Sequence, residues 1–133
     1  MSFSLILLAA GNSHRFKSKI GKPYQKLAGK SLIEINLHKA LQFKQIKKII
    51  IVYNKKDLKK VKSLKLKNIK LIAGGKTRQQ STLKALEHLI NQKSISNVLI
   101  HDVARPNFSK KLFSQILKNM KNSRAVIPKI KIQ

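Results

Sequence analysis

Three short stretches of this sequence combine glycine, arginine, hydroxyl and acidic side chains in patterns that suit the binding of phosphate groups. They are AAGNSHRFKSKIGK at residues 9–22, GGKTRQQS at residues 74–81 and HDVARP at residues 101–106. Small residues let backbone N–H groups approach a phosphate chain closely. A guanidinium or ammonium group supplies the positive charge that such a ligand needs. The three stretches therefore predict a site for a phosphorylated ligand.

The first stretch gives the main signal. Ala9, Ala10 and Gly11 follow an apolar run as a turn of small residues, and Arg15 and Lys22 bring two cations to the same loop. Two familiar phosphate motifs are excluded, because the turn lacks the partner glycines of the dinucleotide fingerprint and a proline follows the lysine where a P-loop needs Ser or Thr. The alternative is an ordinary turn with solvated cations.

The other two stretches add a base-binding signal and a candidate metal ligand. The glycine pair ending at Gly75 lets the chain reach a planar base, and Ser81 in the first helical turn presents a hydroxyl. The alternative is a plain turn with Thr77 as a helix cap. In the third stretch Asp102 is one of only four acidic residues. A carboxylate there can hold Mg²⁺, which takes oxygen ligands and shares them with phosphates. The alternative is a structural Asp that pairs with Arg105 or caps a turn.

The net charge of +26, from 30 basic and four acidic residues, has two interpretations. One is a nucleic-acid-binding surface. The other is a compositional bias toward lysine, which we favour. Only four basic residues are arginine, the type suited to reading bases and clamping phosphates, and aromatic residues for base stacking make up 5%. We therefore expect only non-specific binding of nucleic acid at low salt. Three of the arginines, Arg15, Arg78 and Arg105, fall inside the three stretches, and Arg124 does not.

Several classes of protein are disfavoured. The chain has no cysteine, which excludes disulfides and thiolate metal sites and suits a cytoplasmic protein. No apolar run reaches the length of about 18 residues that a membrane-spanning helix needs. The apolar run Leu5–Ala10 lacks the basic region of a signal peptide, so it is expected to form a strand. The length of 133 residues fits one domain, residues 1–133.

Hydrophobic periodicity predicts elements that place the three stretches together. Strands are expected at residues 3–8, 48–53, 69–73, 97–101 and 125–132, and helices at 31–43, 57–64, 77–90 and 109–120. This alternation predicts a three-layer α/β/α sandwich with a mainly parallel sheet. Ligands of such sheets bind beyond the carboxyl ends of the strands, where all three stretches lie.

Capping signals predict where the helices begin. The expected caps are Ser31 with Glu34, Thr77 with Gln80, Asp57, and Ser109. The expected apolar stripes are Ile33, Leu37, Ala40 and Leu41 in the first helix, Leu83, Leu86, Leu89 and Ile90 in the third, and Leu112, Phe113, Ile116 and Leu117 in the fourth. Lys22 and Pro23 are not expected inside a helix, because proline disfavours the helical conformation in the residue before it.

The stretch LLAAGNSHRFKSKIGKPYQKL, with GGKTRQQS and HDVARP, resembles the signature sequences of the 2-C-methyl-D-erythritol 4-phosphate cytidylyltransferase family. Arg15 and Lys22 keep the interval that separates the family's Arg and Lys. The sequence departs from the pattern where Ser13 replaces a glycine, Phe16 replaces the usual Met, Lys76 replaces a frequent Asp, and the proline lies on the other side of the lysine.

The resemblance implies a Rossmann-like nucleotidyltransferase fold and an enzyme of non-mevalonate isoprenoid precursor biosynthesis. Such an enzyme transfers CMP from CTP to 2-C-methyl-D-erythritol 4-phosphate and releases pyrophosphate. By resemblance, Arg15 and Lys22 are catalytic, Asp102 holds Mg²⁺ and Arg105 holds the acceptor phosphate. CTP binding is assigned to Ala9, Ala10, Gly11, Gly75, Arg78, Ser81, Val103 and Ala104.

The family's domain is nearly twice as long as this chain. The resemblance therefore implies a domain that is incomplete at its C-terminus, without the arm through which family members usually form homodimers. Three alternatives stay open: a cytidylyltransferase that uses ribitol 5-phosphate, a basic nucleic-acid-binding domain, and an inactive truncated remnant.

Overall fold

In the part of the chain that the structure describes, the main sheet has four parallel strands. The computed structural model describes residues 2–11, 21–92 and 97–129. In the sheet the strand order is β5-β4-β1-β6, with β1 at Phe3–Ala9, β4 at Ile46–Tyr53, β5 at Lys70–Ala73 and β6 at Asn97–Asp102. These strands confirm four of the five predicted ones. The fifth is wrong over residues 125–129, which form no strand, and its remaining residues lie outside the described ranges.

Four α-helices of the described residues alternate with the strands, as predicted. They are α1 at Leu32–Ala40, α2 at Leu58–Ser63, α3 at Arg78–Ile90 and α4 at Lys110–Asn119. Short 3₁₀ helices lie at Lys22–Tyr24 (η1), Lys55–Asp57 (η2) and Met120–Asn122 (η3). Within the described ranges, no helix combines the length and the apolar character needed to cross a membrane.

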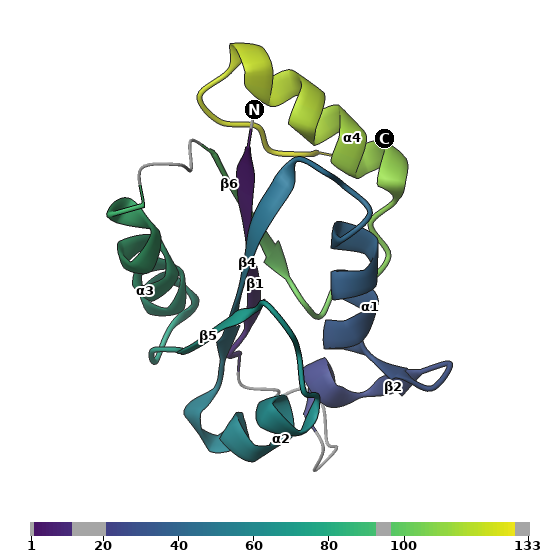
Figure 1. Ribbon diagram of the computed structural model, residues 1–133, viewed down its shortest axis with the longest axis vertical. Coiled ribbons are helices and arrows are strands. Elements are labelled where there is room, and N and C mark those ends of the chain that lie inside the picture. The colour runs from purple at the N-terminus through teal and green to yellow at the C-terminus, as the bar shows by residue number, and fades with distance from the viewer. Residues whose placement is uncertain (1, 12–20, 93–96, 130–133) are drawn as a thin grey trace.

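The helices cover both faces of the sheet, which confirms the three-layer arrangement (Figure 1). Side chains of successive strand residues point to opposite faces. Leu5, Leu7 and Ala9 of β1 therefore join one buried cluster with residues of α1, α2 and α4, including Ile33, Leu37 and Phe113. Ile6 and Leu8 join a second, smaller cluster with Ala85 and Leu89 of α3. The two clusters fix β1 in the centre of the molecule.

Two predicted apolar stripes need correction. The face of α3 that packs on the sheet carries Ser81, Ala85 and Leu89, whereas Leu83, Leu86 and Ile90 are 54%, 36% and 80% exposed. The small residues Ser81 and Ala85, spaced four apart, let the helix approach the sheet closely, so of the four predicted stripe residues only Leu89 lies on the buried face. Helix α1 ends at Ala40, before the predicted end, and Leu41 is 68% exposed.

Most predicted helix starts are confirmed by side-chain hydrogen bonds. Ser31 and Glu34 form the complete capping box of α1, and Ser109 caps α4. Thr77 caps α3, but the Gln80 side chain accepts from the backbone N–H of Lys76 and not from that of the cap residue. At α2, Asp57 occupies the cap position without a capping hydrogen bond.

A 3₁₀ helix and a hairpin lead from residue 21 into α1. Contrary to the sequence expectation, Lys22 begins η1, because proline fits the first turn of a helix, where its missing N–H is not needed. The hairpin pairs β2 (Lys26–Leu27) with β3 (Lys30–Ser31). Ala28 and Gly29 both have positive φ, as a two-residue hairpin turn requires, which confirms the predicted turn.

Candidate active site

The three stretches meet beyond the carboxyl ends of the strands. Ala9 is the last residue of β1 and is buried, Ala10 is half-buried and Gly11 is exposed. In the sheet, Leu8 of β1 lies opposite Asp102 of β6. The parallel register therefore brings the start of the first stretch beside the third.

The second stretch packs directly against the first. The backbone N–H of Gly74 donates to the carbonyl oxygen of Tyr53, at 2.7 Å. A Cβ added to Gly74 would lie 2.5 Å from the Cβ of Ala10 and 2.8 Å from Oγ of Ser81, which is closer than atoms can pack. Only glycine fits this crossing of two loops. Sequence reasoning emphasised Gly75 as the nucleotide contact, and the structure shows that Gly74 makes the close approach.

Ser81 ties the glycine turn to the start of α3. Its hydroxyl oxygen accepts from the backbone N–H of Gly75 at 3.1 Å, and the residue is only 3% exposed. A serine hydroxyl accepts and also donates, so Ser81 keeps a proton to offer. Gly75 itself is half-buried, and an added Cβ there would lie 2.6 Å from the Cβ of Gln80.

Arg78 and Asp102 form an ion pair that joins the second stretch to the third. The Nε atom of Arg78 lies 3.2 Å from Oδ1 of Asp102. The Arg78 side chain is 63% exposed and that of Asp102 is 35% exposed, so solvent screens the pair and it contributes little to stability. Sequence reasoning considered Arg105 as the partner of Asp102, but the backbone N–H of Arg105 donates to the Asp102 carbonyl oxygen instead.

Asp102 also suits the predicted role of magnesium ligand. Among the described residues, no group of three or more His, Cys, Asp or Glu side chains could surround a metal ion. Mg²⁺ is commonly held by one or two carboxylates together with substrate phosphates and water. A single carboxylate at the carboxyl end of β6 fits that donor set, provided that a phosphate ligand supplies other oxygens.

Buried and half-buried donors of α1 hold the loop that follows Asp102. Asn36 is 0% exposed, and its Nδ2 donates to the carbonyl oxygens of Leu32 at 2.7 Å and Val103 at 3.0 Å. The ammonium group of Lys39 donates to the carbonyl oxygens of Pro106 and Phe108, in the latter case at 3.3 Å. Sequence reasoning missed both donors. The available signal was a polar Asn among the apolar residues of the predicted stripe.

His101 also contacts the loop that follows Asp102. Its Nε2 lies 2.9 Å from the carbonyl oxygen of Arg105, and its ring meets that of Phe108 edge-on, with centroids 4.4 Å apart. Burial lowers the pKa of His101 from its ordinary value, more than the hydrogen bond to Arg105 raises it. The surroundings of His101 therefore favour the neutral form of its ring.

The residues after Asp102 differ in what they can offer a ligand. The Val103 side chain is fully buried in the core, and its backbone N–H donates to the carbonyl oxygen of Leu8 at 3.0 Å. Ala104 is half-buried and Arg105 is exposed. Of the residues predicted here for ligand binding, Ala104 and Arg105 thus present side chains outside the core.

Of the two predicted catalytic cations, the structure describes Lys22 but not Arg15. Arg15 lies outside the described residues. Lys22 is exposed at the start of η1, next to the buried Pro23 and Tyr24. Its backbone is fixed by a hydrogen bond from the Gln25 N–H to the Lys22 carbonyl oxygen, at 3.1 Å.

A surface groove lies beside the glycine turn. Its walls carry three lysines and one glutamate, which gives it a net positive charge that attracts anionic ligands. The lining residues are Asn54, Lys55, Gly74, Gly75, Lys76, Gln80, Leu83, Lys84 and Glu87.

Comparison with known proteins identifies relatives over nearly the whole chain. Residues 3–133 match the family model of IspD, 2-C-methyl-D-erythritol 4-phosphate cytidylyltransferase. The chain is 44% identical over 130 residues to the bifunctional enzyme IspD/IspF of Pelagibacter ubique, covering 98% of this chain and 35% of that protein. It is 38% identical over 124 residues to the 2-C-methyl-D-erythritol 4-phosphate cytidylyltransferase of Thermotoga neapolitana, covering 90% of this chain and 54% of that protein.

Solved structures share the fold. The bifunctional IspDF from Campylobacter jejuni superimposes with a TM-score of 0.74 at 35% identity, covering 90% of this chain and 31% of that one. The 4-diphosphocytidyl-2C-methyl-D-erythritol synthase from Anaerococcus prevotii gives a TM-score of 0.74 at 30% identity, covering 98% of this chain and 59% of that one. The chain thus spans between about a third and a little over half of the relatives it matches.

Proposed function

Because the chain belongs to the 2-C-methyl-D-erythritol 4-phosphate cytidylyltransferase family, we propose that it carries the CTP-binding part of such an enzyme. The reaction transfers CMP from CTP to 2-C-methyl-D-erythritol 4-phosphate, in the formation of isoprenoid precursors. The observation that carries the proposal is the contact between the loops after β1 and β5, where Gly74 leaves no space for a side chain against Ala10. A nucleotide that lies across this contact meets backbone groups from both loops.

The proposed chemistry is an in-line displacement. An oxygen of the acceptor phosphate attacks the α-phosphorus of CTP, the bond from that phosphorus to the bridging oxygen breaks, and pyrophosphate leaves with its electron pair. No protein nucleophile is needed, so the protein acts by positioning the reactants and stabilising negative charge. Mg²⁺, when bound, neutralises charge on the triphosphate.

Each site residue has a role in this proposal. Lys22 and Arg15 stabilise the charge on the α-phosphorus, and Asp102 holds Mg²⁺. Arg78 keeps the Asp102 carboxylate in place at the edge of the nucleotide site. The exposed Arg105 meets the acceptor phosphate, and Ser81 offers its hydroxyl proton to the base or ribose.

Nucleotide-dependent thermal stabilisation tests the proposal. A ligand that binds the folded chain raises its melting temperature. We expect CTP with Mg²⁺ to raise it more than ATP or GTP do. Equal shifts for the three nucleotides would indicate attraction of any polyanion by the basic surface, and would overturn the proposal.

A Lys22→Ala variant tests the catalytic assignment. Loss of one donor that stabilises the transition state costs about 3 kcal/mol of barrier, so we expect turnover to fall by about a hundredfold or more. Because Lys22 is exposed, the melting temperature without ligand should hardly change. Unchanged turnover would remove Lys22 from the mechanism.

A further inference from the structure

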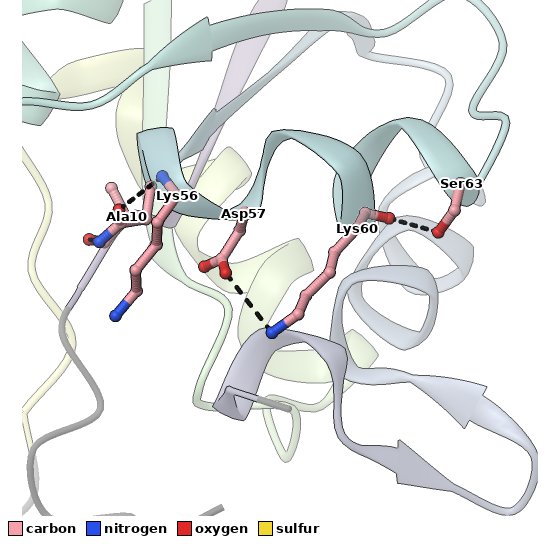
Figure 2. A network of polar contacts seen from close by, with 6 residues as sticks. Ala10, Lys56, Asp57, Lys60 and Ser63 are labelled. Atoms are coloured by element: carbon pink, nitrogen blue, oxygen red, sulfur yellow. Dashed lines mark hydrogen bonds and ion pairs between the residues drawn. The ribbon is translucent and has the colours of Figure 1, made fainter. Parts of the chain in front are cut away.

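The segment that follows β4 contacts Ala10 near the start of the first stretch and Tyr24, two residues beyond its end. This segment, residues 54–60, contains η2 and the first turn of α2. In Figure 2, Ala10 lies beside one end of this segment, and the Asp57–Lys60 pair lies within its other half. None of its residues has a role in the function proposed above.

On one side, Asn54 binds the backbone at the end of β1. Its Nδ2 donates to the carbonyl oxygen of Ala10 at 3.1 Å. Its Oδ1 accepts from the backbone N–H of Lys56 at 3.2 Å and so caps η2. The half-buried side chain of Asn54 therefore links η2 to the peptide group between Ala10 and Gly11.

On the other side, Asp57 and Lys60 support the aromatic ring of Tyr24. Asp57 is 7% exposed, and its Oδ1 lies 3.6 Å from Nζ of Lys60. In Figure 2 the Lys60 side chain extends from α2 toward this carboxylate. The same ammonium group lies 5.7 Å from the centre of the Tyr24 ring, which is within the range of a cation–π interaction.

The Tyr24 ring lies in the same short 3₁₀ helix as Lys22. Tyr24 is 7% exposed and belongs to η1, the 3₁₀ helix that begins at Lys22. The N–H of Tyr24 donates to the carbonyl oxygen of Gly21 at 3.2 Å, and that of Gln25 donates to the carbonyl oxygen of Lys22 at 3.1 Å. A ring packed in the core and two backbone hydrogen bonds leave the backbone of Lys22 little freedom.

We propose that Asn54, Asp57 and Lys60 are positioning residues that set the distance between the Ala10–Gly11 backbone and Lys22. Both groups must reach one triphosphate, and small errors in the placement of such groups reduce rates strongly. The proposal rests on the proposed function for its ligand. It goes beyond that function because it assigns the positioning of the site residues to residues 54–60, which do not touch the reacting atoms.

An Asn54→Asp variant isolates the contact with Ala10. Aspartate still caps η2 but cannot donate to the Ala10 carbonyl. We expect the dissociation constant for CTP with Mg²⁺ to rise about fivefold or more, with a nearly unchanged melting temperature of the free chain. The matched control is Asn122→Asp, an exposed position with the same change of charge. An equal loss of affinity in both variants would mean that charge is responsible, and would overturn the proposal.

A Lys60→Met variant isolates the other contact. Methionine keeps an apolar stem but loses the ammonium group that lies over Tyr24. We expect the N–H of Gln25 to exchange with solvent about tenfold faster, and CTP affinity to fall. The control is Lys62→Met, an exposed lysine on the same helix. Equal exchange rates in the two variants would contradict the role of Lys60.

Tyr24→Phe sharpens the test because it keeps the ring. In the described part of the chain, the Tyr24 hydroxyl has no hydrogen-bond partner, so this variant should behave like the original protein. A loss of CTP affinity in Tyr24→Phe would show that the hydroxyl matters and that the ring–cation account is wrong.

Measurements without nucleotide separate this proposal from the function on which it rests. If the unaltered chain shows no response to CTP, the proposed function fails. The positioning role is then decided by two signals of the free chain, the ¹⁵N chemical shift of Gly11 in Asn54→Asp and the exchange of the Gln25 N–H in Lys60→Met. If both signals change in these variants and neither changes in the control variants, the positioning role is supported. If the signals are unchanged, the positioning role is overturned.

Discussion

Two neighbouring loops of the candidate site are held in opposite ways. The turn after β5, residues 74–81, is held by the close approach of backbones, because no side-chain atom fits at Gly74. The loop after β6, residues 102–108, is held at a distance by donors that Asn36 and Lys39 extend from α1. The first loop requires that residue 74 has no side chain, whereas the second requires the donor groups of Asn36 and Lys39.

This difference determines how each loop responds to mutation. Added volume at a close backbone contact must displace one of the two loops, so the response is abrupt. Donors can be removed one at a time, and each removal costs about the free energy of the hydrogen bonds lost. A side chain added at Gly74 should therefore disrupt the loop after β5 in one step. The loop after β6 should instead lose stability in small steps as its donors are removed.

Gly74→Ala should have the largest effect. The new Cβ would lie 2.5 Å from the Cβ of Ala10, and forcing apart such a contact costs about 2–3 kcal/mol. Chemical denaturation should show this loss, and stabilisation by CTP should disappear. Gly11→Ala serves as the control, because among the described residues no atom lies within 4 Å of a Cβ added there. Similar stabilities of the two variants would refute the close-contact account of the turn.

Asn36→Leu should have the next largest effect. Leucine is similar in volume but leaves the carbonyl oxygens of Leu32 and Val103 without the donor they now share. A buried carbonyl that loses its partner costs about 1–2 kcal/mol, which denaturant unfolding measures. Asn36→Asp should be at least as destabilised, because it cannot donate and also buries a charge. An Asn36→Asp variant as stable as the original protein would show that the donors are not needed.

Lys39→Met should have a smaller effect. The variant loses the ammonium group that lies 5.1 Å from the centre of the Phe108 ring, and the carbonyl oxygens of Pro106 and Phe108 lose a half-buried donor. We expect a loss of about 1 kcal/mol and faster hydrogen exchange in residues 104–108. Lys44→Met, at an exposed position, is the control. Equal exchange in both variants would mean that Lys39 does not hold the loop.

His101 should contribute the smallest effect, and only at low pH. Burial lowers its pKa in the folded state below the ordinary value of about 6.5. The unfolded chain therefore binds a proton more readily, and the folding free energy from this residue is lost as the pH falls from about 6.5 through the lowered pKa. The stability of His101→Gln, relative to the original protein, should improve as the pH is lowered over this range. A pH-independent difference would contradict the burial of a neutral ring.

Much of the fold could be predicted because its signals are local. The apolar runs that form β1, β4, β5 and β6 are flanked by turn residues, and the caps at Ser31, Thr77 and Ser109 are side-chain hydrogen bonds within one helical turn. The three stretches of the candidate site also stand out in the sequence, since glycines and arginines are rare in this lysine-rich chain. The parallel sheet then brings them together.

The rest depends on contacts between residues far apart in the sequence. Nothing local predicts that Arg78 pairs with Asp102, that Asn36 donates to Val103, or that Asn54 reaches Ala10. The stripe of α3 was misjudged for the same reason. Its buried face is chosen by how closely the helix approaches the sheet, and Ala85 allows a closer approach than leucine. Hydrophobicity alone does not report that distance.

Strand β6 lies at one margin of the described sheet, and Ile100 on it is 44% exposed. A strand in this position can pair with the same strand of another molecule. The net charge of +26 opposes such pairing through mutual repulsion of the copies. Dissolved ions reduce the reach of that repulsion to about 8 Å at physiological ionic strength. We therefore expect added salt to favour association of the copies of this chain with one another.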